Sequence, residues 1–258
     1  MKNFTALMAV TALLVCAAQA GEVKKAKPAS KPAANSAVKA SVSTQTAKNE
    51  LQAAAAESEE TRFEKTVITG LKDWDSKLLT LRTRFTQEVD FSDAGLKQHV
   101  EGVLSYMKPD LLKIEHIKPA RQLVYTDKKE LWIYKPEDSQ AVHTSWDAWQ
   151  KNQSSNFSGI MDFGNYAALP EKNDITISKD ASAPYYITMV LTRKNNPGLY
   201  TLTLALSSTD YFPVEAALTV DKTTITTRLE DPEKNTTLDK KLFSFVPPKG
   251  TEVLEFKN

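Results

Sequence analysis

Residues 102–140 contain the feature that most constrains the fold of this chain, a series of short apolar segments at regular spacing. The stretch GVLSYMKPDLLKIEHIKPARQLVYTDKKELWIYKPEDSQ is interrupted by two Lys-Pro steps, at Pro109 and Pro119, and by the turn Asp127-Lys128. Short alternating segments separated by turn residues predict four consecutive antiparallel strands. Because proline has no backbone N–H, we expect both prolines at strand ends or edges.

Apolar residues in these strands alternate with polar ones, which is typical of a sheet with one covered face. The last segment is apolar at every position, so we expect cover on both of its faces. Large apolar residues without a catalytic grouping suggest a wall that holds a hydrophobic ligand. Periodicity alone favours an ordinary packed core, because protein interiors leave little room for a ligand. The residues concerned are Leu104, Tyr106, Leu112, Ile114, Trp132 and Tyr134.

The remaining folded part is predicted to be mainly β (α+β). Residues 62–81 form an amphipathic helix that ends near Thr83, with Val67, Leu71, Trp74, Leu78 and Leu81 as its apolar stripe. Residues 143–172 suggest one or two short helices. Alternating segments elsewhere bring the count to about ten antiparallel strands, and such a sheet curls into an open, incomplete barrel. We expect the N-terminal helix and the middle helical segment to form a lid.

The first 20 residues are predicted to be a secretory signal peptide. One lysine precedes an apolar run, and Ala18-Gln19-Ala20 is a small-x-small cleavage signal, so cleavage is expected after Ala20 and the protein is expected in the periplasm. Cys16, the only cysteine, has two interpretations. It is either lost with the signal peptide, which we favour, or lipidated. The residue before it, Val15, fits a lipidation signal poorly.

Residues 21–58 are predicted to be a disordered linker, rich in alanine, lysine and proline. Residues 21–56 have six lysines and two glutamates, a net charge of 6 − 2 = +4, whereas residues 57–258 carry 26 − 30 = −4. The linker is either a solvated spacer, which we favour, or a basic segment that touches anionic lipid headgroups or the cell wall. Residues 59–258 are expected to form one domain.

No motif in the chain indicates an enzyme. The three histidines, His99, His116 and His143, lack metal-binding spacing and have no cysteine partner. No serine lies in a nucleophile-elbow motif, and no phosphate-binding glycine loop is present, so neither a metal nor a cofactor is expected. A net charge near zero argues against nucleic-acid binding.

Several motifs, taken in order, resemble those of the periplasmic outer-membrane lipoprotein carriers, the LolA-like proteins. The resemblance covers about residues 60–256, nearly all of the expected domain. Its motifs are Arg84-Phe85-Thr86-Gln87, Gly102-Val103-Leu104, Lys108-Pro109, Pro119, Asp127, Leu131-Trp132-Ile133-Tyr134, Pro136, Gln140 and the closing Phe243-Ser244-Phe245-Val246-Pro247-Pro248-Lys249-Gly250.

This resemblance implies a monomeric periplasmic chaperone that holds the acyl chains of lipoproteins in a hydrophobic cavity. Its partners would be acylated lipoproteins or lipid, an inner-membrane release complex and an outer-membrane acceptor. The first helix would supply lid residues Leu71 and Leu78, and the middle helix Phe157 and Ile160. The expected lipid-binding set is Leu71, Leu78, Phe85, Leu104, Tyr106, Lys108, Leu112, Ile114, Trp132, Tyr134, Phe157 and Ile160.

Two positions depart from the family pattern. Lys108 stands where the family usually has an arginine implicated in holding the lid and in ligand release, and lysine lacks the planar fork of arginine. Asp127-Lys128 replaces an Asp-Gly turn, so either Lys128 adopts a positive φ or the turn type differs. Two alternatives for the function remain open: a LolA-like paralogue that carries another lipid, and a periplasmic lipid or lipoprotein sensor with the same fold.

Overall fold

The computed structural model describes residues 43–151, 163–179, 183 and 186–256 of the chain. The chain divides into two compact units, one of which ends at Val67, while residues 68–258 belong to the other. Helix α1 (Ser43–Lys77) crosses this boundary. The expected site residues Phe157 and Ile160 lie outside the described residues, as do the predicted signal peptide and residues 21–42.

Helix α1 differs from its prediction at both ends. It begins at Ser43, so the part of the predicted disordered linker from 43 to 58 is helical. Alanine, glutamate and glutamine, which are frequent there, favour a helix intrinsically. It ends at Lys77 because Asn235, distant in sequence, binds the chain at that point: its side chain donates to the Lys77 carbonyl (3.2 Å) and accepts from the Leu79 amide (2.7 Å). Leu81, predicted to be helical, is therefore a buried strand residue.

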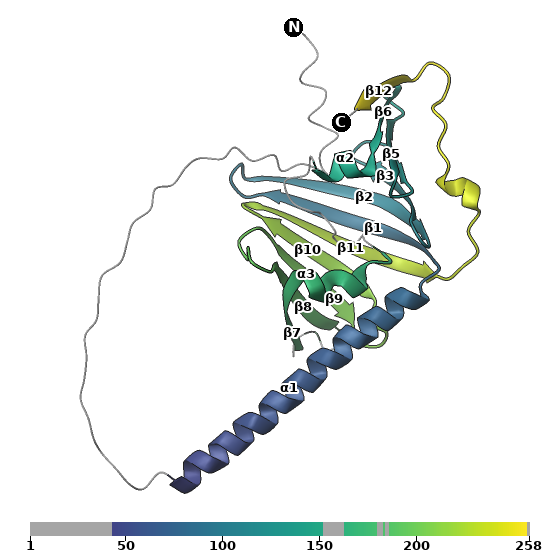
Figure 1. Cartoon of the computed structure of the whole chain (residues 1–258). Coiled ribbons are helices and arrows are strands. Elements are labelled where there is room, and N and C mark those ends of the chain that lie inside the picture. The colour runs from purple at the N-terminus through teal and green to yellow at the C-terminus, as the bar shows by residue number, and fades with distance from the viewer. Residues whose placement is uncertain (1–42, 152–162, 180–182, 184–185, 257–258) are drawn as a thin grey trace. The chain divides into compact units, whose positions relative to one another are not determined.

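All twelve strands that the structure describes form one sheet in the order β12-β6-β5-β4-β3-β2-β1-β11-β10-β9-β8-β7 (Figure 1). The sheet is open, with β12 and β7 at its edges, as predicted. Every pairing is antiparallel except that of β12 with β6. The strands are β1 (Thr80–Phe91), β2 (Leu96–Met107), β3 (Leu111–Lys118), β4 (Gln122–Thr126), β5 (Glu130–Lys135), β6 (Gln140–Ser145), β7 (Asn173–Lys179), β8 (Tyr186–Arg193), β9 (Thr201–Ser207), β10 (Pro213–Val220), β11 (Thr223–Lys234) and β12 (Glu252–Phe256).

The predicted meander corresponds to β2–β5, which pair in sequence order. Pro109 and Pro119 lie between strands, as expected. Lys128 has φ 59°, so this lysine adopts the left-handed conformation that the Asp127-Lys128 turn left open. The strands missed by the estimate of about ten are β6, whose residues 143–145 were predicted to belong to the helical region, and β7, which follows that region.

The register defines two faces of the sheet, because side chains alternate along each strand. We call the face that contains Phe85 and its directly opposed cross-strand neighbours the inner face, and the other the outer face. The inner face extends from β7 to β6 through Ile177, Met189, Leu204, Ala216, Thr227, Gln87, Phe85, Leu104, Ile114, Val124, Ile133 and Val142. Most of these side chains are buried, so the inner face forms the core.

Short helical segments account for the middle of the chain. They are α2 (Trp146–Lys151), a 3₁₀ helix (Tyr166–Ala168) and α3 (Leu169–Lys172), and a further 3₁₀ helix (Lys240–Phe243) precedes β12. In the described part of the chain, no helix combines the length and the apolar character required to cross a membrane.

Candidate functional site

Seven of the expected lipid-binding residues belong to one continuous buried surface. Phe85, Leu104, Tyr106, Leu112 and Ile114 share the inner face across β1, β2 and β3, and each is at most 7% exposed. Leu71 on α1 and Leu78 just beyond it are each 2% exposed. The structure therefore brings together an apolar wall and a helix end, with Lys108 exposed at their margin.

Trp132 and Tyr134 do not belong to this wall, so the prediction that they share it is wrong. They oppose Tyr125 and Leu123 across β4 and therefore lie on the outer face. Phe245 packs against them there, with ring centroids 5.5 Å from Trp132 and 5.3 Å from Tyr134. Their intervening neighbours, Leu131 and Ile133, take the inner positions and are buried. Residues 131–134 of β5 are all apolar. The sequence therefore does not indicate which two of these four side chains face inward.

The outer face next to Trp132 is closed by the C-terminal segment. His143 stacks on Trp132 with ring centroids 4.0 Å apart, and its two ring nitrogens lie 2.8 Å from Glu130 and 3.1 Å from Glu255 of β12. Burial lowers the pKa of His143, but the two carboxylates outweigh it and hold the pKa above its usual value. Ring stacking and charge pairs thus fix this segment in place.

The inner wall is covered by an aromatic cluster that involves α1 and residues 163–166. Trp74 makes edge-to-face contacts with Tyr166 and Phe212, with ring centroids 5.7 and 5.1 Å apart. Phe163 lies between Trp74 and the wall residue Tyr106, with its ring centroid 6.4 Å from Trp74 and 5.5 Å from Tyr106. These contacts join the helix end to the wall through side chains alone.

Asp75 is the main polar anchor of this cover. It is 4% exposed, and its two carboxylate oxygens accept the backbone amides of Gly164 (2.8 Å) and Tyr166 (3.2 Å). Backbone N–H donors compensate a buried carboxylate efficiently. Phe163 and Asp75 were not among the predicted site residues, because neither shows the alternation or motif that identified the others.

Lys108 attaches the end of β2 to the end of α1. Its ammonium group donates to the Ser76 carbonyl (2.6 Å), and its backbone amide donates to the Leu79 carbonyl (2.8 Å). A cation at a helix C-terminus is favourable, because the last carbonyls lack helical partners and the helix dipole is negative there. The expected contact between residue 108 and the lid helix is thus present, made by lysine to a single carbonyl.

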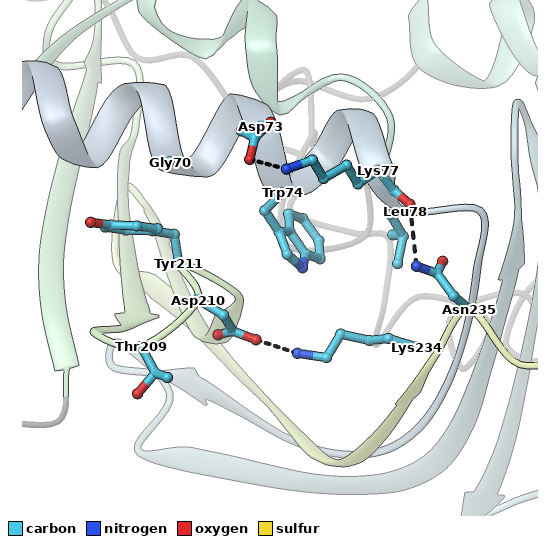
Figure 2. A pocket seen from close by; sticks show the side chains of 10 residues that line it. All are labelled: Gly70, Asp73, Trp74, Lys77, Leu78, Thr209, Asp210, Tyr211, Lys234 and Asn235. Carbon is cyan, nitrogen blue, oxygen red and sulfur yellow. Dashed lines mark hydrogen bonds and ion pairs between the residues drawn. The ribbon is translucent and has the colours of Figure 1, made fainter.

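A cavity of about 460 Å³ lies between the end of α1, the β9–β10 turn and the end of β11 (Figure 2). Two Lys–Asp pairs form its polar lining, Lys77 with Asp73 and Lys234 with Asp210. Its walls are Gly70, Asp73, Trp74, Lys77, Leu78, Thr209, Asp210, Tyr211, Lys234 and Asn235. Trp74 and Leu78 thus border both this cavity and the buried surface.

Gly70 allows Tyr211 of the β9–β10 turn to lie directly against α1. A Cβ at position 70 would lie 2.3 Å from the Tyr211 ring, which is closer than any real contact. Tyr211 itself has φ 60°. Glycine is unfavourable inside a helix by about 1 kcal/mol relative to alanine, so its presence here is explained by this close approach.

Gly102 has a similar role within the wall. A Cβ there would lie 2.6 Å from the Phe85 ring, which extends across β2 to contact His116 edge-to-face, with centroids 5.9 Å apart. His116 is 7% exposed, and burial lowers its pKa to about 4, so it is neutral at ordinary pH. Gln87 and His116 are both buried polar side chains on this otherwise apolar face. Buried polar groups of this kind usually have hydrogen-bond partners.

The described residues contain no group of three or more histidine, cysteine, aspartate or glutamate side chains arranged to bind a metal ion. The buried charged residue near the wall, Asp75, is engaged by backbone amides. The arrangement of these residues suits the shelter of apolar groups.

Comparison with known proteins identifies relatives over most of the chain. The model of the family described as "Outer membrane lipoprotein carrier protein LolA" matches residues 76–246. The outer-membrane lipoprotein carrier protein of Dechloromonas aromatica is 28% identical over 186 residues, covering 71% of this chain and 85% of the relative. That of Klebsiella pneumoniae (strain 342) is 26% identical over 184 residues, covering 71% and 85%.

Among solved structures, an uncharacterized conserved protein from Thermus thermophilus superposes with a TM-score of 0.50 and 11% identity. The match covers 75% of this chain and 99% of that one. This likeness supports the fold.

Proposed function

Because the chain belongs to the LolA family of outer membrane lipoprotein carrier proteins, we propose that it is a periplasmic chaperone that binds the acyl chains of lipoproteins and carries them toward the outer membrane. An inner-membrane release complex would supply the cargo, and an outer-membrane acceptor would receive it. The observation that supports this proposal is a continuous apolar wall covered by the aromatic side chains of Trp74, Phe163 and their neighbours.

A soluble carrier has two opposing physical requirements. Exposed acyl chains cost about 0.8 kcal/mol per CH₂ group in water, so the carrier must provide an apolar surface of comparable extent. It must also release the cargo, so that surface must be accessible by an inexpensive movement. Separation of the α1 end from the sheet meets both requirements, because it uncovers the inner wall without breaking strand pairing.

The polar contact that Lys108 makes at the edge of the cover can be exchanged for water at low cost. Lys108 holds one helix carbonyl at the exposed margin of the wall, and a net hydrogen bond of this kind contributes about 1 kcal/mol. Lys108→Leu should therefore loosen the cover and speed cargo release more than it weakens capture. Lys108→Arg would keep the charge, and its transfer rate provides the control.

Leu71 offers the sharpest test of this proposal. Leu71→Glu places a carboxylate where a buried side chain lies, and we expect at least about a 100-fold weaker Kd for a synthetic triacylated lipopeptide. Lys72→Glu, next to it and exposed, is the matched control and should bind normally. Titration of the fluorescent lipopeptide measures both, and equal affinity of the two variants would contradict the proposal.

The natural cargo can be identified directly by mass spectrometry of the protein purified natively from its own periplasm. Recovery of triacylated lipoprotein supports the carrier function. A free phospholipid or glycolipid would instead indicate a LolA-like paralogue that carries another lipid.

A further inference from the structure

Gln87 has an unused hydrogen-bonding atom in the middle of the inner wall. Its side chain is 1% exposed, and its amide nitrogen donates to the Thr227 hydroxyl at 2.9 Å. Its amide oxygen has no partner among the described residues. Gln87 opposes Thr227 and Val100 across the neighbouring strands, so it lies on the same face as Phe85.

His116 presents a second such atom near Phe85. The imidazole is buried, and its Nε2 has no partner within the described part of the chain. It opposes Gly102, and the Phe85 ring bridges the space above that glycine to reach it. Phe85 therefore has one such residue, Gln87, two positions along its own strand and the other, His116, two strands away on the same face.

Two other buried polar groups of the inner face are satisfied within the protein. The Thr83 hydroxyl, 2% exposed, donates to the Glu230 carbonyl at 2.8 Å, and Thr126 accepts the Lys128 amide at 2.9 Å. An unsatisfied buried polar atom is unfavourable. Two of them beside one aromatic ring indicate a surface that is completed by something other than the protein.

The Gln87 amide and the His116 imidazole can each either donate or accept a hydrogen bond. The Thr227 hydroxyl can donate to Gln87 as well as accept from it, so the Gln87 amide can turn and offer either its oxygen or its nitrogen to a ligand. A neutral imidazole nitrogen likewise carries either a proton or a lone pair, depending on its tautomer. Hydrocarbon chains use neither capability, whereas an ester carbonyl accepts a hydrogen bond and an amide group can both accept and donate one.

We propose that Gln87 and His116 bind the ester and amide linkages at the head of the acyl chains, so that the wall recognises acylated ligands and not hydrocarbon alone. This inference rests on the proposed function and adds the chemical class that the wall selects. The Phe85 ring would support the first carbons of a chain, and the two polar atoms would pair with the linkages. The apolar rest of the inner face would hold the remaining hydrocarbon.

The test varies both protein and ligand. The probes are two synthetic cysteinyl lipopeptides of equal chain length, one with ester-linked and one with ether-linked glyceryl chains, so that only the carbonyl groups differ. The proteins are the mature wild type, Gln87→Leu, His116→Leu and the control Thr83→Val, which removes a polar group already satisfied within the protein. Competition against a fluorescent lipopeptide gives the ratio of ether to ester Kd for each protein.

We expect the wild type and Thr83→Val to prefer the ester ligand by about 10-fold, and Gln87→Leu or His116→Leu to lose most of that preference while still binding the ether ligand. A ratio does not change when a variant merely loses stability, so a folding defect cannot mimic this result. Equal ratios in all four proteins would overturn the inference, as would a wild type without preference, the result expected if ordered water alone satisfies both atoms. A wild type that binds neither lipopeptide would instead remove the proposed function itself.

Discussion

The two faces of β5 are covered in different ways, although the same short strand supplies both. Leu131 and Ile133 point to the inner face and join the covered wall, whereas Trp132 and Tyr134 point outward under Phe245. On the outer side, close ring stacking and two carboxylates around His143 fix the C-terminal segment. On the inner side, aromatic edges and a few hydrogen bonds hold the cover.

Under the proposed function, this difference would let one sheet combine a closed face with a face that opens. The outer face uses stacked rings and charge pairs that the chain itself completes. The inner face uses apolar contacts, which a bound acyl chain could replace, and leaves the Gln87 and His116 atoms unpaired. Four substitutions or conditions test this contrast, with expected effects of decreasing size.

The largest expected change in stability concerns His116 on the inner face. Because the pKa of folded His116 is lowered to about 4 from an ordinary value of 6.5, the unfolded chain binds a proton more readily, and stability is lost as pH falls from 6.5 to 4. The expected loss is about 3 kcal/mol. Urea unfolding at several pH values should show this slope in the wild type and a smaller one in His116→Leu. Parallel profiles would mean that His116 is solvated.

Phe245 tests whether the outer face is separate from the binding function. Phe245→Ala removes the ring that covers Tyr125, Trp132 and Tyr134, and should lower the free energy of unfolding by about 2 kcal/mol. Lipopeptide affinity should remain unchanged. Val246→Ala, at a side chain 82% exposed, is the neutral neighbour. A Phe245→Ala variant that binds poorly but unfolds normally would reverse the roles assigned to the two faces.

The effect of Gly70→Ala on stability is expected to have opposite signs with and without the Tyr211 ring. Alanine favours a helix over glycine by about 1 kcal/mol, but a Cβ at position 70 would collide with Tyr211, and overpacking costs about 1–3 kcal/mol. We therefore expect Gly70→Ala to destabilise the protein by about 1 kcal/mol, and to stabilise it by a similar amount in a Tyr211→Ala background. Thermal unfolding of the four proteins measures this, and the same sign in both backgrounds would show that the ring does not rest on the helix.

The smallest expected change in stability concerns His143 on the outer face. Glu255 and Glu130 hold the pKa of His143 above its usual value, so its contribution is fully present below pH 6.5 and is lost as pH rises through the raised pKa. The effect should stay under about 1 kcal/mol. Hydrogen exchange of β12, corrected for intrinsic rates, should quicken at higher pH in the wild type and not in His143→Gln. His99→Gln, at an exposed histidine of β2, should behave as the wild type.

Much of the sheet follows from the sequence, because alternation is a local property. The strands β2–β5 follow from spacing and turn composition, whereas the positive φ at Lys128 was one of two alternatives that the comparison with the family pattern left open. The end of α1 does not follow from local sequence, because the residue that determines it, Asn235, lies far along the chain. The sequence also did not show that Leu131, and not Trp132, faces inward. The side chains on both faces of this strand are apolar, and only the position of Phe245 distinguishes the two faces.

The inner wall could be predicted in part for the same reason. Leu104 and Ile114, expected in one wall, do lie on the same face of the sheet, and their role in lipid binding stays a prediction. Asp75 and Phe163 depend on contacts between segments that no local pattern reveals. The position of Gln87 and His116 near Phe85 required the register, because only strand pairing places the three on one face.

The central claim is that the end of α1 must leave the sheet before cargo can bind, and a reversible disulfide tests it most directly. The Tyr211 Cγ atom lies 2.7 Å from an ideal Cβ at Gly70, so the two Cβ positions are within about 4 Å, which suits a disulfide between Gly70→Cys and Tyr211→Cys. The oxidised double variant should fail to bind triacylated lipopeptide, and reduction should restore binding to the level of the two single variants. Equal binding in the oxidised and reduced forms would contradict the account.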